Sequence, residues 1–403
     1  MHSPVYVTVS ARTENGRLFV YLLFFSDIPW EHLYQRPQQL AHRLARRYPV
    51  LWIEPATLGH TAHWHADAVA DHVHRLTVPQ FPHHARSPYL RALSRGASRI
   101  RPLRFLLFRI QQHLLRRALH RLGVKPEKML VLIQNFQYIR LALTLHPSMM
   151  LFDYIDDAFG FTAFPPYVRR EWEETIRAAD VVTVTTTALR NRIVAAVPRE
   201  VHIVNNAVEV AQFQNAAGER PADLPPPQRP IVLYVGAIAQ WMDFPLLHML
   251  CRSLPEVSFV FIGPVHPAVR SDVEAVRAAG NCSFLGTKPY SAVPRYLRHG
   301  DVGMIPFVRN TLTSAVNPVK FYEYSAAGIP TVTTFFSDDL LEFGDLIFLA
   351  RTHEEFTAQV RHTLGLANDG RLKGELRAFA LRNDWDVRAA MVAGLIDHHT
   401  HPR

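Results

Sequence analysis

The residues best suited to chemistry lie between Asn317 and Thr334, which read Asn-Pro-Val-Lys-Phe-Tyr-Glu-Tyr-Ser-Ala-Ala-Gly-Ile-Pro-Thr-Val-Thr-Thr. Asn317 is placed to cap a helix that Gly328 ends. Lys320 and Glu323 are three positions apart and share one face of that helix. A cation near a helix N-terminus binds a diphosphate, and a carboxylate one turn later accepts hydrogen bonds from both hydroxyl groups of a ribose. The pair therefore predicts a nucleotide-sugar site, and an ordinary solvent-facing Lys–Glu pair is the alternative.

Glycines that end two apolar runs extend this prediction. Gly236 follows the run over 231–235, and Gly263 follows the run over 258–262. A glycine after a strand lets the backbone approach a phosphate or a base, although a tight turn explains the same residue. The loop around Lys288 is expected to read a base edge, with Lys288 adding a phosphate contact.

Three carboxylates follow another apolar run, over 149–153. Asp153, Asp156 and Asp157 are expected to position acceptor hydroxyl groups or accept a proton, and neighbouring carboxylates raise one another's pKa. Asp153 is the preferred catalytic residue on this side. Helix capping is the alternative for Asp156 and Asp157.

A histidine-rich stretch, with His63, His65, His72 and His74 near two aspartates, invites a metal assignment. Its spacings match no compact metal-site template, so a solvated loop is expected there instead. We expect no metal and no cofactor.

Short β-branched and aromatic runs alternate with helical patterns along the chain, which predicts an α/β fold with parallel sheets covered by helices. The predicted strands are 19–25, 50–53, 129–134, 149–153, 181–185, 201–205, 231–236, 258–263, 282–285, 302–305, 331–334 and 346–349. Five of the ten residues from Pro221 to Pro230 are proline, which indicates a linker. We expect two doubly wound Rossmann-like domains, 1–208 and 231–385, joined by the linker 209–230. Residues 386–403 form a C-terminal helix or tail that packs back towards the first domain.

Composition fits a soluble globular protein, with 48% hydrophobic and 20% charged residues in a chain of 403. No apolar run has the roughly 18–20 residues that a membrane-spanning helix needs. The first residues lack the pattern of a secretory signal, and Cys251 and Cys282 are far apart in the sequence. These features favour a cytoplasmic protein without a disulfide framework.

Positive charge is concentrated in one segment. Residues 72–126 contain eleven Arg and one Lys but no Asp or Glu, and because the whole chain carries +9, the remainder carries −3. Within residues 89–122 leucines alternate with arginines, and Pro102 is expected to divide two helices. An apolar stripe beside a cationic face favours an anionic membrane surface, and a core-packing helix is the alternative. Nucleic acid is not expected, because few aromatic residues lie among these arginines.

Together these motifs resemble the family 4 type of GT-B glycosyltransferases, in a branch that assembles bacterial polysaccharides. The resemblance rests on the strand ending at Gly236, Phe284-Leu-Gly286, Asp301-Val-Gly-Met-Ile-Pro306 and the Asn317 to Pro330 motif. The first half contributes Trp30, Gln35-Arg-Pro-Gln-Gln-Leu-Ala41, Asp153-Tyr-Ile-Asp-Asp157 and Asn205-Asn-Ala-Val208, and the end contributes Trp385-Asp386.

The resemblance implies a hexosyltransferase with two domains facing a central cleft. The first domain holds the acceptor, with Arg36, Asp156 and Asp157 on that side, and the second holds the donor. It also implies retention of configuration, with UDP-sugar favoured over GDP-sugar. The expected acceptor is a cell-surface polysaccharide or a lipid-linked glycan, which places the protein at the inner face of the plasma membrane.

Two departures from the family pattern stand out. The family's first glutamate, eight positions before Glu323, is replaced by Ala315. The family's Arg and Lys after the first donor-domain strand are absent from residues 237–243, so Lys320 is the principal phosphate cation and Arg309 a weaker one. A catalytically inactive nucleotide-binding partner protein at the membrane and a sugar-nucleotide epimerase therefore remain as alternatives.

Overall fold

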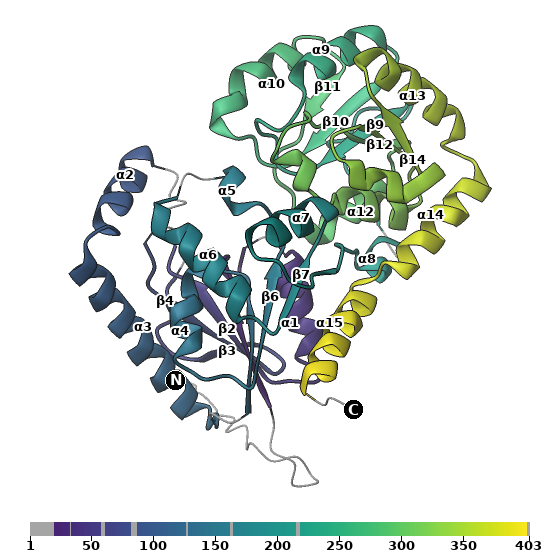
Figure 1. The fold of residues 1–403 in the computed structure, drawn as a ribbon. Coiled ribbons are helices and arrows are strands. Elements are labelled where there is room, and N and C mark those ends of the chain that lie inside the picture. Colours follow the sequence, from purple (N-terminus) through teal and green to yellow (C-terminus); the bar gives the residue numbers. More distant parts are fainter. Residues whose placement is uncertain are drawn as a thin grey trace, which may run out of the picture. The chain divides into compact units, whose positions relative to one another are not determined.

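The computed structural model describes residues 20–32, 34–57, 61–81, 87–125, 128–161, 164–214 and 218–400. They form two compact units, each built on one sheet (Figure 1). The first unit holds the described residues up to Val184, Leu189–Val204 and those from Ala389 onward, and the second holds Thr185–Ala188 and Asn205–Arg388. The predicted α/β class with doubly wound parallel sheets is confirmed.

The sheet of the first unit has the order β3-β4-β2-β1-β5-β6-β7-β8 and is parallel except for the β3–β4 pair. Its strands are β1 (Tyr21–Phe25), β2 (Val50–Pro55), β3 (Asp67–Ala70), β4 (Val73–Val78), β5 (Met129–Ile133), β6 (Met149–Tyr154), β7 (Val181–Val184) and β8 (His202–Ile203). Its helices are α1 (Arg36–Leu44), α2 (Pro88–Ala97), α3 (Arg101–Arg121), η2 (Phe136–Tyr138), α4 (Ile139–Leu143), α5 (Ala158–Phe161), α6 (Pro166–Ala178), α7 (Thr187–Ala196) and the later part of α15 (Trp385–Thr400).

Central strands of this sheet are buried along their whole length because helices cover both faces, and their residues are apolar except for Glu54 in β2 and Asp153 in β6. Every residue of β1, β2, β5 and β6 is buried. Phe24 pairs with Trp52 across the β1–β2 ladder, and their rings stack 4.9 Å apart. The register brings the carboxyl ends of β5, β6 and β7 together at one edge, where the buried polar side chains of Gln134 and Asp153 meet.

The expectation of a solvated loop over the histidine-rich stretch holds for residues 61–66, which form no helix or strand, but was wrong for residues 67–78. Residues 67–78 form the β3–β4 hairpin, and β4 buries Val73, Leu76 and Val78 against the sheet. Residues 76–78, Leu-Thr-Val, alternate apolar and polar side chains, a short strand signal that the histidines obscured. His63 pairs with Asp67 at 3.0 Å.

The second unit has a fully parallel sheet of order β11-β10-β9-β12-β13-β14. Its strands are β9 (Ile231–Val235), β10 (Ser258–Ile262), β11 (Cys282–Phe284), β12 (Val302–Ile305), β13 (Thr331–Thr334) and β14 (Ile347–Ala350). Its helices are α8 (Val210–Gln214), α9 (Phe244–Ser253), η3 (Pro267–Val269), α10 (Arg270–Arg277), η4 (Tyr290–Ala292), α11 (Val293–Leu297), η5 (Thr313–Ala315), α12 (Val319–Ala327), η6 (Asp338–Leu346), α13 (His353–Leu366), α14 (Gly370–Arg382) and the start of α15.

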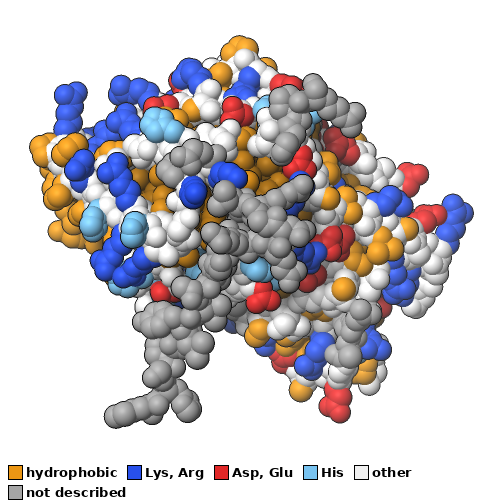
Figure 2. Space-filling view, turned by 90° about the horizontal axis from the view of Figure 1, so that it is seen from below, with side chains coloured by type: hydrophobic (Ala, Val, Ile, Leu, Met, Phe, Trp, Pro, Cys, Tyr) orange, Lys and Arg blue, Asp and Glu red, His pale blue; other side chains and the backbone are white. Residues whose placement is uncertain are grey.

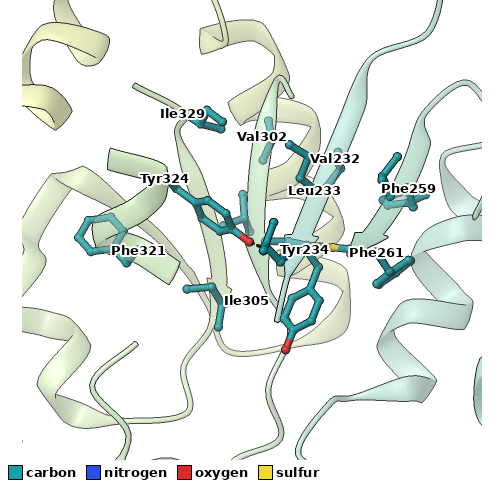
Figure 3. Packing of buried hydrophobic residues seen from close by; sticks show 14 of the residues in the cluster. Val232, Leu233, Tyr234, Phe259, Phe261, Val302, Ile305, Phe321, Tyr324 and Ile329 are labelled. Atoms are coloured by element: carbon teal, nitrogen blue, oxygen red, sulfur yellow. Dashed lines mark hydrogen bonds between the residues drawn. The ribbon is translucent and has the colours of Figure 1, made fainter. Parts of the chain in front are cut away.

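Helix α12 is anchored in the core of this unit (Figure 3). Tyr324 reaches from α12 across the sheet, and its hydroxyl accepts a hydrogen bond from the Val235 N–H at 3.0 Å. Phe321 packs on Phe343 and Phe379 from later helices. The helix that carries Lys320 and Glu323 is therefore held from both sides.

The ends of α12 differ in part from the prediction. Gly328 ends the helix in the left-handed conformation, with φ of 74°, as expected. Pro318 rather than Asn317 occupies the N-cap position, and no side chain caps it. Asn317 instead accepts a hydrogen bond from the Asn206 N–H at 2.8 Å, because the segment after β8 passes beside it.

The proline-rich segment is part of the second unit rather than a free spacer. Phe213 of α8 and Leu224 are buried in the core of that unit. Tyr296 donates a hydrogen bond to Asp223 at 2.9 Å, which fixes the middle of the segment. Prolines here shape a packed connection.

The basic segment forms the two predicted helices, α2 and α3, and Pro102 lies in the first turn of α3. Arg47 contacts Asp397 at 2.6 Å, and residues from Ala389 onward in α15 belong to the first unit. Among the described residues, no helix is long and apolar enough to cross a bilayer.

Candidate functional site

Lys320 projects from the first turn of α12 towards the end of β9. Its Nζ lies 5.3 Å from the ring centre of Tyr234 and 5.2 Å from that of Phe307. No hydrogen bond or ion pair joins this amine to any residue that the structure describes. Cation–π contacts orient the ammonium group without neutralising it. Lys320 is therefore a positioned cation that an anion can still engage.

Glu323 lies one turn further along α12 and is only 7% exposed. Burial raises its pKa to about 7, although the charge of Lys320 and a hydrogen bond from Tyr290 oppose that rise. Burial likewise lowers the pKa of Lys320, and Glu323 opposes that shift. A ligand that brings an anion to Lys320 and hydroxyl donors to Glu323 stabilises both charged forms.

Gly236 and Gly263 bring the ends of β9 and β10 together beside Lys320. The Gly236 N–H donates to the Ile262 carbonyl, and the Gly263 N–H donates to the Gly286 carbonyl. Their φ angles are 142° and 149°, and a Cβ on Gly263 would lie 2.0 Å from the Gly236 oxygen. Only glycine fits this approach. The predicted contact of these strand ends with a phosphate or a base stays a prediction.

Two of the residues expected at the nucleotide are held by other groups. Lys288 forms an ion pair with Asp223 at 2.7 Å, and this hydrogen bond raises the pKa of Lys288. Asn317 is tied to Asn206. Arg309, the weaker cation candidate, pairs with Asp338 at 3.0 Å. The side chains expected at the nucleotide are those of Lys288, Asn317, Lys320 and Glu323. Of these four, the fold brings Lys320 and Glu323 together, and neither has another ion-pair partner among the described residues.

Asp153, in the first unit, is buried with 1% exposure at the end of β6. It accepts hydrogen bonds from two nitrogens of Arg36, from Gln134 and from Thr183, at 3.0, 2.8, 2.9 and 2.7 Å. Burial alone would raise the pKa of Asp153, but the Arg36 charge and these hydrogen bonds outweigh it and lower the pKa. The expected rise from neighbouring carboxylates is therefore wrong for Asp153.

This environment changes the role we assign to Asp153 and Arg36. Both carboxylate oxygens are occupied, and Arg36, with 3% exposure, also donates to the Val204 carbonyl at 2.9 Å. The pair braces α1 against the ends of β6, β7 and β8. Asp153 is therefore better suited to positioning than to touching an acceptor.

The other two acidic residues have different surroundings. Asp157 is buried and forms an ion pair with Arg192 and a hydrogen bond with Tyr154. Asp156 is exposed. Of the three carboxylates, Asp156 is the one open to a ligand. No group of three or more metal-ligating side chains occurs among the described residues.

Comparison with known proteins places this architecture. No family model matches the chain. It is 26% identical over 220 residues to a Bacillus subtilis (strain 168) protein named as the teichuronic acid biosynthesis glycosyltransferase TuaH, a match covering 52% of this chain and 55% of that protein. The chain thus spans about half the length of this curated relative.

Solved structures match over nearly the whole chain. Sucrose-phosphate synthase from Thermosynechococcus elongatus has a TM-score of 0.68 at 15% identity, covering 94% of this chain and 98% of that one. Anabaena HepE in complex with UDP has a TM-score of 0.61 at 13% identity, covering 94% and 99%. The chain has the GT-B fold.

Within this GT-B chain, position 315 lacks the carboxylate that the family pattern predicts. Ala315 is 1% exposed in η5, and its carbonyl accepts a hydrogen bond from Thr186 at 3.3 Å. The methyl side chain of Ala315 carries no polar group that could contact a ligand. Any contact with a donor sugar must therefore come from other groups.

The sequence did not predict the residues that surround the Lys320–Glu323 pair or those that bind Asp153. Tyr234, Phe307 and Tyr290 surround Lys320 and Glu323, and Gln134 and Thr183 complete the shell of Asp153. Gln134 directly follows an apolar strand, a signal that was available in the sequence. The partners of Lys320 come from β9 and the loop after β12, and sequence spacing alone gives no such distances.

Proposed function

We propose that this protein is a nucleotide-sugar-dependent glycosyltransferase whose second unit binds the donor through Lys320 and Glu323. One observation carries this: a cation with no described ion-pair partner lies one helical turn from a buried carboxylate, beside two glycine strand ends. In the proposed complex the Lys320 ammonium meets the diphosphate and the Glu323 carboxylate accepts the ribose hydroxyl groups. UDP-sugars are the favoured donors, supported by the UDP complex of the HepE structure.

The proposed reaction transfers a hexosyl group to a hydroxyl of a cell-surface polysaccharide or lipid-linked glycan. The bond between the sugar's anomeric carbon and the phosphate oxygen breaks, and the acceptor oxygen forms the new glycosidic bond. Negative charge grows on the departing diphosphate, where Lys320 and the N-terminus of α12 stabilise it. The departing phosphate takes the acceptor proton, with retention of configuration. The name of TuaH supports a polysaccharide acceptor.

Isothermal titration with UDP tests the donor site. Lys320→Ala and Glu323→Ala are each expected to weaken UDP binding at least tenfold, because each removes a charge-assisted contact worth about 1.5–3 kcal/mol. Lys373→Ala on α14 removes a lysine elsewhere in the second unit and serves as the matched control. Unchanged affinity in both site variants would remove the proposed nucleotide site.

Product analysis separates this proposal from its two alternatives. A transferase releases UDP only as sugar appears on an acceptor or on water. An inactive partner protein binds UDP but consumes no donor. An epimerase yields an altered sugar without any acceptor.

We further propose that α2 and α3 dock on an anionic membrane surface and bring the acceptor side to its substrate. Large apolar side chains stand exposed there, among them Tyr89, Leu93, Phe105 and Leu106, with exposures of 76%, 59%, 65% and 57%. Arginines flank them (Figure 2). Flotation with anionic vesicles that weakens with salt supports this docking, and equal flotation with neutral vesicles would contradict it.

A further inference from the structure

A cationic pocket lies beside α3 in the first unit, and none of the side chains that bind Asp153 lines it. It has a volume of about 550 Å³, opens to the surface, and is lined by residues of α3, η2, α4, α6 and the segment after β4. Four guanidinium groups line it, those of Arg101, Arg104, Arg140 and Arg170, and Glu171 is the single carboxylate in its lining. We call it the arginine pocket.

The four arginines differ in whether other side chains of the protein already bind them. Arg104 lies 3.5 Å from Glu171 and stacks 4.0 Å above the Tyr167 ring, so it belongs to the wall. Arg140 approaches Glu174 only at 4.0 Å, with both side chains largely exposed. Arg101 and Arg170 have no hydrogen-bond or ion-pair partner among the described residues. Because one buried carboxylate faces four guanidinium groups, the pocket is short of negative charge.

An exposed apolar ridge borders this pocket. Leu103, Phe105, Leu106 and Ile110 of α3 are 42%, 65%, 57% and 42% exposed. Phe105 belongs to both features, since it also lines the pocket. Figure 2 shows hydrophobic and basic side chains intermixed at the left of the view, where α3 lies. Apolar surface and unpaired guanidinium groups thus meet at one edge.

This pairing fits a molecule with an anionic head and apolar tails. Guanidinium groups bind phosphate in a planar, bidentate manner, which makes arginine the suited side chain for such a head. A pocket of about 550 Å³ accommodates a phosphate-bearing headgroup, whereas acyl chains are too large for it and would lie along the ridge. Amide groups of Gln80, Gln111 and Gln137 in the lining offer contacts to headgroup hydroxyls.

We propose that the arginine pocket binds the phosphate headgroup of an anionic bilayer phospholipid while the apolar ridge enters the acyl region. This inference rests on the membrane docking in the proposed function and adds a specific, saturable site to it. Diffuse attraction depends on the number of basic side chains near the surface, with each worth about 1 kcal/mol. If a pocket binds the headgroup, the affinity for the membrane also depends on where each arginine lies.

Two double variants with the same change in net charge distinguish diffuse attraction to the membrane from binding in the arginine pocket. Arg140→Gln with Arg170→Gln removes two pocket arginines from α4 and α6. Arg116→Gln with Arg117→Gln removes two exposed arginines of α3 outside the pocket. Partitioning of the full chain onto phosphatidylglycerol vesicles is expected to fall roughly tenfold further in the pocket variant than in the control, equivalent to about 1.4 kcal/mol. An equal loss in both variants would overturn the pocket.

A second measurement uses glycerol 3-phosphate, which carries the headgroup chemistry without the tails. It is expected to displace the wild-type protein from vesicles and to leave the residual binding of the pocket variant unchanged. Saturation of the pocket by glycerol 3-phosphate with no effect on vesicle binding would assign it to a soluble phosphate and overturn the lipid assignment. UDP titration of both variants is independent of the pocket, so failure of the donor site would show as lost UDP binding whatever the vesicles report.

Discussion

Gly236 and Lys320 are in direct contact: a Cβ at Gly236 would lie 2.5 Å from the Lys320 Cε and 2.8 Å from its Nζ. The missing side chain of Gly236, at the end of β9, therefore leaves the space that the Lys320 amine of α12 occupies. Its positive φ of 142° is also a backbone conformation that side chains disfavour.

Gly236→Ala is expected to displace Lys320 and to weaken UDP binding at least tenfold. The test is a double-mutant cycle with Lys320→Ala, because coupled residues are not additive. If Gly236→Ala acts through Lys320, it should cause little further loss of UDP affinity in the Lys320→Ala background. Full additivity in the titrations would mean that Gly236 acts on the nucleotide separately.

Asp153→Asn is expected to destabilise the first unit by about 3–5 kcal/mol, because it leaves the buried Arg36 charge uncompensated. The amide also turns donor atoms towards the groups that now donate to Asp153. Denaturant unfolding measures this cost. Asp71→Asn, in the exposed turn between β3 and β4 of the same unit, is the matched control and should stay within about 0.5 kcal/mol of wild type. Similar stabilities for the two variants would contradict a bracing role for Asp153.

Glu171 predicts a pH dependence of stability. Burial raises its pKa to about 7, against the opposing charges of Arg104 and Arg140 and with a smaller contribution from Glu174. The folded state then holds a proton that the unfolded state releases above its own pKa of about 4.3. This carboxyl therefore lowers the free energy of unfolding as pH rises from about 4.5 to about 7, by about 3 kcal/mol, with no further loss above that.

Glu171→Gln should remove this dependence. The variant should gain stability over wild type progressively between pH 5 and pH 7.5, measured by chemical denaturation at each pH. Glu173→Gln on the same helix is the control. A constant difference between Glu171→Gln and wild type across this range would contradict the raised pKa.

How much of this molecule follows from sequence is clearest at α12. Its helix, its glycine end and the shared face of Lys320 and Glu323 are local features, so spacing and turn chemistry predict them. Asn317 was wrong as a cap because a distant residue, Asn206, takes its side chain. The role of Asp153 was predicted wrongly for the same reason, since the donors that bind it come from α1, from Gln134 just after β5, and from β7.

The unpredicted strands and the two cysteines also show which features local sequence patterns do not predict. Polar residues hid β4, although Leu76, Thr77 and Val78 carry a short strand pattern. Cys251 in α9 and Cys282 in β11 are separated in sequence, yet their sulfur atoms are 2.7 Å apart. Patterns within about one turn or one strand were readable, whereas partners chosen by the sheet order were not.

Two glycines of the second unit should respond oppositely to alanine. A Cβ at Gly303 in β12 would lie 2.3 Å from the Tyr324 ring, whereas one at Gly365 in α13 meets nothing within 4 Å. Gly303→Ala should cost about 1–3 kcal/mol by overpacking, and Gly365→Ala should stabilise by about 0.5–1 kcal/mol. Thermal unfolding measures both. Loss of stability in both variants would show that the Tyr324 contact is not the cause.

Tyr290 should tune the donor site through the ionisation of Glu323. Its hydrogen bond to the carboxylate opposes the burial that raises the pKa of Glu323 to about 7. Tyr290→Phe removes that opposition, so the pKa rises further and a smaller fraction of Glu323 is ionised at pH 7. Since the carboxylate form accepts the ribose hydroxyl groups, the variant should bind UDP several-fold more weakly at pH 7.

The deficit should shrink as pH rises, because both proteins approach full ionisation of Glu323. The quantity to measure is the ratio of UDP dissociation constants, Tyr290→Phe over wild type, at pH 7.0, 7.75 and 8.5. Taking the ratio at each pH cancels the titration of UDP and of Lys320, which both proteins share. Tyr290→Phe in a Glu323→Gln background is the control and should show no pH-dependent ratio. A ratio that stays constant in the wild-type background would mean that Tyr290 contacts the nucleotide itself rather than acting through Glu323.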